Sequence, residues 1–260
     1  MSAMTELAAT GLTLAGRLAD ADFRLSPGEL VVIVGPNGSG KSSLMRLLAG
    51  QGHPDSGSVR LDGNEIAGFD PRARARRIAY LPQRAEVAWP IAVADMVALG
   101  RFAFGGAEVT RGAGDAGQWL DEVGCAPLAR RSTATLSGGE LALVALARAF
   151  AAETPLLLLD EPTAALDPRR QIDVMTRLLA RSRAGQGIAV ILHDLNLAAQ
   201  FADRILWMRD TRIVAESTSD AVAVAANAAA IFEVSVRIES GSDGRVQTLA
   251  VQQDRPSRSE

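Results

Sequence analysis

The segment Gly35-Pro36-Asn37-Gly38-Ser39-Gly40-Lys41-Ser42 decides the fold class of this chain. It matches the pattern G-x-x-x-x-G-K-[ST], and it follows the apolar, Val- and Ile-rich run Glu29–Val34. The next residues, Lys41–Ala49, carry leucines at helical spacing. A strand, a glycine-rich loop and a helix in this order form the context in which the pattern marks a phosphate-binding loop. The sequence therefore predicts an α/β fold with a nucleotide site at this loop.

Elementary chemistry explains why the loop, Gly35–Ser42, suits a phosphate. Glycines let several backbone N–H groups face one anion, and the following helix N-terminus adds about half a positive charge. Lys41 can reach the β- and γ-phosphates, and the Ser42 hydroxyl can hold Mg²⁺. Lys41 is also the only lysine among 27 basic residues, which indicates a pocket that requires a compact ammonium group. A glycine-rich turn with an incidental lysine is the alternative, which the flanking strand and helix disfavour.

Further apolar runs predict the rest of a sheet. Leu156–Leu159 and Ile188–Leu192 read as buried strands, and Pro168–Arg183 between them has the apolar period of a helix. Ile78–Pro82 is a shorter strand that ends at its proline. Strands that alternate with helices of this size imply βαβ units and a mainly parallel sheet. Residues 85–140 have few strand signals, so we expect them to form a helical insertion.

Four polar residues follow the predicted strands directly. Asp160 and Glu161 come after Leu156–Leu159, His193 follows Ile188–Leu192, and Gln83 follows Pro82. Because the carboxyl ends of parallel strands meet at one edge, these side chains are expected to lie beside the phosphate loop. Asp160 would hold Mg²⁺, and Glu161 would orient and polarise the attacking water. Taken singly, the acids could be exposed strand-end residues and His193 a structural histidine.

The composition excludes several other classes of protein. With 27 basic and 30 acidic residues among 260, the net charge is −3, which disfavours a general nucleic-acid binder. Hydrophobic residues at 48% exclude a mainly disordered chain. No apolar run approaches the ~18 residues of a membrane span, and no secretory signal is expected. Cys125 is the only cysteine, so no internal disulfide is possible, which fits a reducing cytoplasm.

A second loop with the character of an anion site is Leu136-Ser137-Gly138-Gly139-Glu140, which leads into a predicted helix. On its own this could be an ordinary loop-to-helix junction. The chain already has one predicted phosphate-binding site, at the loop Gly35–Ser42. A second nest of backbone N–H groups at a helix N-terminus therefore suggests a phosphate bound to another subunit.

Taken in this order, the motifs resemble the nucleotide-binding subunit of ATP-binding-cassette (ABC) transporters, over roughly Gly28 to Glu216. The resemblance implies a P-loop NTPase fold with a mainly parallel central sheet, an N-terminal antiparallel β portion and a helical subdomain. It implies one domain over residues 1–260, with the helical subdomain at about 85–140 and a short C-terminal extension at 217–260. The motif assignments that follow are Walker A at Gly35–Ser42, the Q-loop glutamine at Gln83, the signature motif at Leu136–Glu140, Walker B at Asp160 and Glu161, the D-loop at Ala165–Asp167 and the switch histidine at His193.

The resemblance also implies an assembly and a reaction. Two copies would sandwich two ATP molecules head to tail, each between one Walker A loop and the partner subunit's Ser137 and Gly139. The implied partners are transmembrane permease subunits and, indirectly, a substrate-binding protein, with the ATPase peripheral at the cytoplasmic face of the membrane and no nucleic acid. The expected residues are, for nucleotide binding, Gly35, Pro36, Asn37, Gly38, Ser39, Gly40, Lys41, Ser42, Ser43, Ser137, Gly138 and Gly139; for Mg²⁺, Ser42, Gln83 and Asp160; and for catalysis, Glu161, His193 and Gln83.

Three segments narrow the resemblance to one group of importers. Arg76–Gln83, Val93–Arg101 and His193–Ala199 look like the ATPases that energise uptake of iron-siderophore, haem or cobalamin. Only a short stretch follows Glu216, so no appended regulatory domain is expected, which also suits that group. The alternatives are an exporter ATPase, a soluble cassette that acts on ribosomes or DNA, and a binding module that no longer hydrolyses ATP. The cargo itself is not encoded here, because it contacts the permease and the binding protein.

The chain departs from the family pattern at three places. Apolar Leu141–Leu143 follows the signature motif where polar residues are usual, so it is expected to pack against the sheet or against a divergent permease. Thr10–Asp20 contains no aromatic residue to stack on adenine, and Phe23 lies too close to a strand to replace it. We therefore expect weaker ATP affinity or a relaxed base preference. Ala164 stands in the D-loop region where serine is frequent.

Overall fold

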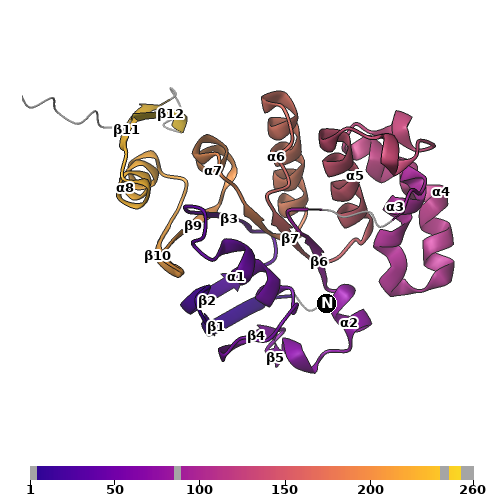
Figure 1. Ribbon diagram of the computed structural model, residues 1–260, viewed down its shortest axis with the longest axis horizontal. Helices are drawn as coiled ribbons and strands as arrows, with labels where there is room; N and C mark the ends of the chain where they lie inside the picture. Colours follow the sequence, from indigo (N-terminus) through magenta and orange to yellow (C-terminus); the bar gives the residue numbers. More distant parts are fainter. Residues whose placement is uncertain (1–4, 85–88, 241–245, 253–260) are drawn as a thin grey trace, which may run out of the picture.

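The computed structural model describes residues 5–84, 89–240 and 246–252, and its centre is a sheet with the strand order β10-β9-β3-β8-β7-β6 (Figure 1). Five of these strands are parallel, and only β10 runs antiparallel to its neighbour β9. The mainly parallel sheet expected from the sequence is therefore confirmed. The strands are β3 (Leu30–Val34), β6 (Ile78–Leu81), β7 (Leu156–Asp160), β8 (Gly187–Ile191), β9 (Arg204–Arg209) and β10 (Arg212–Ser217).

The central sheet is covered on both faces, so alternate residues of each strand enter two different cores. In β3, Val32 and Val34 join the core under the helices α5, α6 and α7, whereas Val31 and Ile33 join the core under α1 and a second sheet. This double burial is why the strands read as unbroken apolar runs. The helices are α1 (Lys41–Leu48), α5 (Gly138–Ala151), α6 (Pro168–Arg183) and α7 (Leu195–Phe201).

The second sheet is antiparallel and has the order β2-β1-β4-β5, as expected for the N-terminal portion. Its strands are β1 (Leu7–Leu14), β2 (Leu18–Leu25), β4 (Ser56–Leu61) and β5 (Asn64–Glu65). The tip of the β1–β2 hairpin is fixed to the residue that precedes β4, since the backbone N–H of Ala15 donates to the Asp55 carboxylate at 2.7 Å. This anchoring holds the hairpin tip beside the phosphate loop.

Between β6 and β7 the described residues form helices and turns and no strand. The elements there are α3 (Val93–Ala98), the 3-10 helix η2 (Leu99–Phe104), α4 (Gly106–Glu122), the short 3-10 turns η3 (Ala126–Leu128) and η4 (Thr133–Thr135), and α5. α4 is a helix of 17 residues, despite its glycines. Buried Ala116, Trp119 and Leu120 pack it onto the core and offset the weak propensity. Before β6 lie η1 (Ile66–Gly68) and α2 (Pro71–Ala75).

The described part of the C-terminal extension contains one helix and two strands. α8 (Ala221–Phe232) buries Val224, Ala228 and Ile231, which share one helical face. β11 (Ser235–Ser240) and β12 (Val246–Gln252) then form an antiparallel hairpin. The predicted fraying beyond Val251 falls mostly on residues 253–260, outside the described residues.

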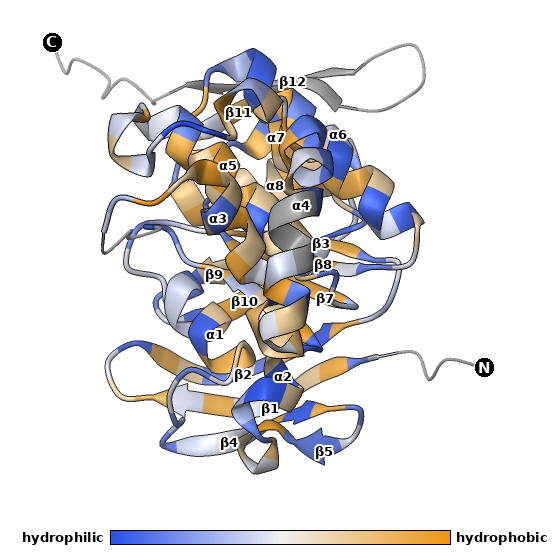
Figure 2. Ribbon diagram, turned by 90° about the vertical axis from the view of Figure 1, so that its right-hand side faces the viewer, coloured by the Kyte–Doolittle hydropathy of each residue, from blue (hydrophilic) through white to orange (hydrophobic). Residues whose placement is uncertain are grey.

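The hydropathy of the helices and strands matches these layers. Figure 2 shows hydrophobic colouring along the strands of the central sheet and over much of α5, whereas α2 is mostly hydrophilic. Within the described ranges, no helix combines the length and apolar character that crossing a bilayer requires.

Candidate active site

The phosphate loop joins β3 to α1 and is curled by glycines at left-handed backbone angles. Gly38 has φ 80° and Gly40 has φ 96°, a region that side chains with a Cβ rarely adopt. At Gly40 a Cβ would also lie 2.3 Å from the carbonyl oxygen of Arg17, at the tip of the β1–β2 hairpin. The hairpin tip therefore packs directly against the loop, and only glycine fits between them.

Lys41 lies at the centre of this loop with 6% of its surface exposed. Its Nζ donates hydrogen bonds of 2.8 Å to the carbonyl oxygens of Gly35 and Pro36, which leaves one of its three protons for another acceptor. Burial lowers the pKa of Lys41, and the nearby carboxylates of Glu161 and Asp160 act in the opposite direction. The ammonium group is thus held in place where a phosphate would sit on the loop.

Glu161 lies at the end of β7, and the ends of β6 and β8 bring one polar side chain each to it. Nε2 of Gln83 donates to one carboxylate oxygen of Glu161 at 2.7 Å. Nε2 of His193 lies 2.6 Å from the other oxygen. The backbone of Glu161 has φ 54°, an uncommon angle for a residue with a side chain. Both carboxylate oxygens are therefore oriented by neighbours from adjacent strands.

Asp160, one residue earlier, has the environment that a hard cation prefers. Only 1% of it is exposed, and its Oδ1 has no hydrogen-bond partner among the described residues. Burial raises the pKa of Asp160, whereas a hydrogen bond from the Ser42 hydroxyl lowers it. A buried carboxylate oxygen without a partner, next to a hydroxyl, fits the oxygen ligands of Mg²⁺. Gln83, the third expected ligand, donates from its amide nitrogen to Glu161, which leaves its amide oxygen for a cation.

Lys41, Glu161 and the two side chains that orient Glu161 line an open cleft of about 670 Å³, here called the phosphate-loop cleft, whereas Asp160 is not part of its lining. It gathers most of the residues expected from the phosphate loop together with those of the strand ends. Arg17 and Gly16 complete its wall, although neither belongs to any of the predicted motifs. The lining consists of Gly16, Arg17, Asn37, Gly38, Gly40, Lys41, Ser42, Ser43, Gln83, Glu161 and His193.

The signature loop, Leu136–Glu140, is not part of that lining. Its Ser137 caps α5 by accepting a hydrogen bond from the Glu140 backbone N–H at 3.3 Å, and Glu140 accepts one from the Ser137 N–H at 2.8 Å. The hydrogen bonds from Ser137 lower the pKa of Glu140. At Gly139 a Cβ would lie 3.0 Å from the carbonyl oxygen of Ala165. The signature loop therefore packs on the D-loop of its own chain, and Ser137, Gly138 and Gly139 do not line the phosphate-loop cleft.

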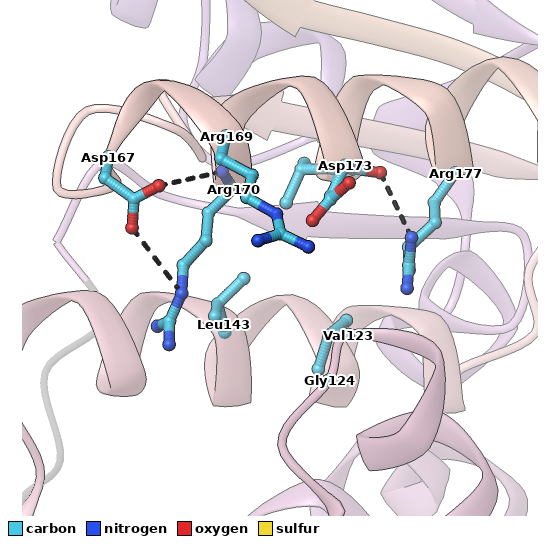
Figure 3. Close-up of a pocket in the computed structure, with 9 residues that line it drawn as sticks. Val123, Gly124, Leu143, Asp167, Arg169, Arg170, Asp173 and Arg177 are labelled. Carbon is cyan, nitrogen blue, oxygen red and sulfur yellow. Dashed lines mark hydrogen bonds and ion pairs between the residues drawn. The ribbon is translucent and has the colours of Figure 1, made fainter.

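Asp167 ends the D-loop and begins α6, as the close-up of Figure 3 shows. Its carboxylate accepts a hydrogen bond of 3.0 Å from the backbone N–H of Arg170 and lies 3.6 Å from Nε of the same arginine. The cavity beside it, of about 430 Å³, has three α6 arginines in its lining, Arg169, Arg170 and Arg177, and shares no residue with the phosphate-loop cleft. Asp167 is thus held in a helix cap, apart from the cleft of its own chain.

The departures from the family pattern have simple structural outcomes. Leu143 is buried in the core, and Leu141 and Ala142 pack against it partly buried. We expected this apolar turn to pack either against the sheet or against a permease. In the structure it packs against the core of its own chain. Phe23 is buried in the opposite core, and no aromatic side chain is among the described residues that line the phosphate-loop cleft.

A second hollow, here called the docking groove, lies between α2, β6, η2 and α5 and has a volume of about 470 Å³. Its rim carries two exposed apolar side chains, Phe102 at 63% and Leu99 at 43%. Arg148 also lines it, and burial lowers the pKa of that arginine. Within the described part of the chain, Arg148 has no hydrogen-bond or ion-pair partner. The groove thus combines apolar surface with an arginine available to a carboxylate.

Comparison with known proteins agrees with the motifs. The family model described as ABC transporter matches residues 18–164. The hemin import ATP-binding protein HmuV of Methylobacillus flagellatus is 40% identical over 95% of this chain and 96% of that protein. The protein of the same name from Hahella chejuensis is 42% identical over 85% of this chain and 88% of its own length.

Solved structures show the same fold. The dimeric structure of MJ0796, a bacterial ABC transporter cassette, has a TM-score of 0.75 at 26% identity and covers 82% of this chain and 98% of its own. A metal-chelate type ABC transporter in an inward-facing conformation has a TM-score of 0.79 at 24% identity, covering 95% and 97% of the two chains. With the family match and the curated relatives, these likenesses show that the chain belongs to the ABC transporter family as one of its ATP-hydrolysing cassettes.

Proposed function

We propose that this chain is the ATPase subunit of an importer that carries haem into the cell. The observation that carries the proposal is the roughly 40% identity to two hemin import ATP-binding proteins over nearly the whole chain. Glu161, held between Gln83 and His193, supports a cassette equipped for hydrolysis rather than a binding module. The same relatives favour haem over iron-siderophore or cobalamin, and import over export.

The site works as half of a composite one. ATP would bind with its phosphates on the N–H groups of the phosphate loop and on Lys41, and the partner subunit's Ser137 and Gly139 would close over the γ-phosphate. The position of the signature loop outside its own cleft supports this arrangement, since one copy offers phosphate ligands from one side only. The cassette MJ0796, whose structure is dimeric, is similar to this chain. Two copies would therefore bind two nucleotides.

Glu161 would take part in the hydrolytic step directly. One of its oxygens would polarise the attacking water, while Gln83 and His193 keep the carboxylate in line with the γ-phosphate. Ser42 and Asp160 would hold Mg²⁺, which neutralises charge on the β- and γ-phosphates. Lys41 donates to the same oxygens from the loop side. Surrounding the γ-phosphate with donors on all sides requires the closed dimer.

The membrane partner would bind at the docking groove, so this chain would lie at the membrane as a peripheral subunit, at its cytoplasmic face. We infer a permease segment with apolar residues for Phe102 and Leu99 and a carboxylate for Arg148. The groove borders β6, whose end carries Gln83, so movement of the permease would reach Glu161 over a short path. In this view residues 85–140 act as a helical subdomain of one cassette domain, with 217–260 as its C-terminal extension.

Replacing Phe102 tests the docking groove. We expect Phe102→Asp to weaken binding to the permease by about 30-fold, as for an apolar contact at an interface centre, and to leave hydrolysis by the isolated chain within about twofold of wild type. Val214→Asp, at another exposed apolar residue outside the groove, is the matched control and should bind normally. The measurement is permease recovered with each tagged variant. Equal recovery with Phe102→Asp and Val214→Asp would contradict this docking position.

Affinity purification tests the function. Tagged Glu161→Gln protein with Mg-ATP is incubated with detergent-solubilised membranes, and the captured proteins are identified by mass spectrometry. We expect a permease with many transmembrane helices, and a complex that retains added haem-loaded binding protein after washing, as seen by haem absorbance that a mock capture lacks. Capture of ribosomal or DNA-repair proteins without a membrane protein would contradict the transport function and leave the ATP site intact.

A further inference from the structure

Arg17 lies at the phosphate-loop cleft and has no role in the mechanism described above. It belongs to the turn between β1 and β2, which is closed by a 2.8 Å hydrogen bond from the Arg17 N–H to the Leu14 carbonyl oxygen. The Arg17 carbonyl oxygen touches the phosphate loop at Gly40, where a Cβ would come within 2.3 Å. The backbone of residue 17 is therefore fixed beside the loop that takes the phosphates.

The guanidinium group of Arg17 is exposed and available. Within the described residues it has no hydrogen-bond or ion-pair partner. Many other arginines of the chain are bound to carboxylates, and among the described residues that line the phosphate-loop cleft Arg17 is the only arginine. The paired arginines include Arg24, Arg77, Arg101, Arg131, Arg181, Arg183, Arg204 and Arg209.

The lining of the cleft indicates which part of a nucleotide Arg17 would meet. Phosphates occupy the loop N–H groups and Lys41, and Gln83, Glu161 and His193 surround the γ-phosphate end. The remaining wall consists of Gly16 and Arg17, so the nucleoside leaves the loop on that side. Gly16 offers no side chain. Arg17 is thus the one side chain of the described lining that is placed at the base end.

We propose that Arg17 stacks its planar guanidinium on the adenine base of ATP. A guanidinium is attracted to the face of an aromatic ring and presents a flat surface to it, as an aromatic side chain would. No aromatic side chain of the described lining competes for that position. The inference rests on the nucleotide site proposed above and adds the group that holds the base. Because stacking does not read the edge of a base, this contact accepts any purine.

The test separates stacking from attraction to phosphate. The variants Arg17→Ala, Arg17→Trp and Arg17→Lys are titrated calorimetrically with Mg-ATP and with inorganic tripolyphosphate, which has no base. Arg60→Ala, at an exposed arginine of β4 outside the cleft, is the matched control. We expect Arg17→Ala to weaken ATP binding by about 5- to 30-fold and tripolyphosphate binding by about twofold at most in ~0.15 M salt. Arg17→Trp should restore ATP binding to within about threefold of wild type, whereas Arg17→Lys should not.

Several outcomes would overturn the proposal. Equal losses for ATP and tripolyphosphate in Arg17→Ala would show a phosphate contact instead, as would rescue by Arg17→Lys without rescue by Arg17→Trp. Unchanged ATP affinity in Arg17→Ala would show no contact at all. Wild-type protein that binds neither ligand would overturn the nucleotide site together with the stacking, whereas the Arg17 outcomes leave that site intact.

Discussion

The Glu161→Gln variant is expected to bind Mg-ATP, remain closed as a dimer and lose hydrolysis by about 10²- to 10⁴-fold, the range for removal of a general base. Glutamine has nearly the same shape as glutamate, so it can stay between Gln83 and His193. It cannot accept a proton from water. Binding is therefore retained, and the step that reopens the dimer is blocked.

Two measurements check this expectation. Phosphate release reports hydrolysis, and light scattering after size-exclusion chromatography with Mg-ATP reports the dimer. Glu65→Gln, at an exposed glutamate of β5, is a control that should behave as wild type. Hydrolysis by Glu161→Gln at the wild-type rate in the assembled transporter would show that another group activates the water.

The Lys41→Ala variant is expected to abolish turnover, with a loss of about 10³-fold or more, because a charged donor to the transferred phosphoryl group is removed. The two hydrogen bonds of Lys41 to Gly35 and Pro36 also shape the loop, so Mg-ATP binding should weaken as well. Lys41→Arg should fail too, since a buried loop that closes on an ammonium group leaves no room for a broad guanidinium fork.

Phosphate release by the assembled transporter measures the effect of Lys41→Ala. A thermal melt by circular dichroism shows whether the variant is folded. A folded Lys41→Ala protein that keeps a tenth of the wild-type rate would contradict the role given to this lysine.

The central part of the fold could be predicted from the sequence because its strands are buried on both faces. β3, β7 and β8 therefore appear as continuous apolar runs, and α6 keeps a clear helical period between Pro168 and Arg183. Once the strands are parallel, Asp160, Glu161, His193 and Gln83 must meet at one edge. The hydrogen bonds that Gln83 and His193 make to Glu161 show that these three side chains do meet there.

Other features depend on packing between distant parts of the chain. The sequence analysis gave no helix at Ala221–Phe232, although its alanines and the Asp220 cap both favour one. The β11–β12 hairpin has a weaker local signal, because β12 mixes polar with apolar residues. The sequence left two positions open for Leu141–Leu143, and only the packing of Leu143 decides between them. Nothing in the local sequence marks Arg17, since the contact of its backbone with Gly40 brings it to the cleft.

The measurement that tests the account most directly is transport by the assembled complex in proteoliposomes, with the ATPase, its permease and the binding protein. Haem taken up and phosphate released are followed together, with cobalamin and a ferric siderophore as competing cargoes. The account predicts that haem-loaded binding protein stimulates hydrolysis, and that haem accumulates on the side of the membrane that carries the ATPase, opposite the binding protein. Both signals should be lost in Lys41→Ala. Hydrolysis that does not respond to haem, together with uptake of cobalamin or siderophore instead, would contradict it.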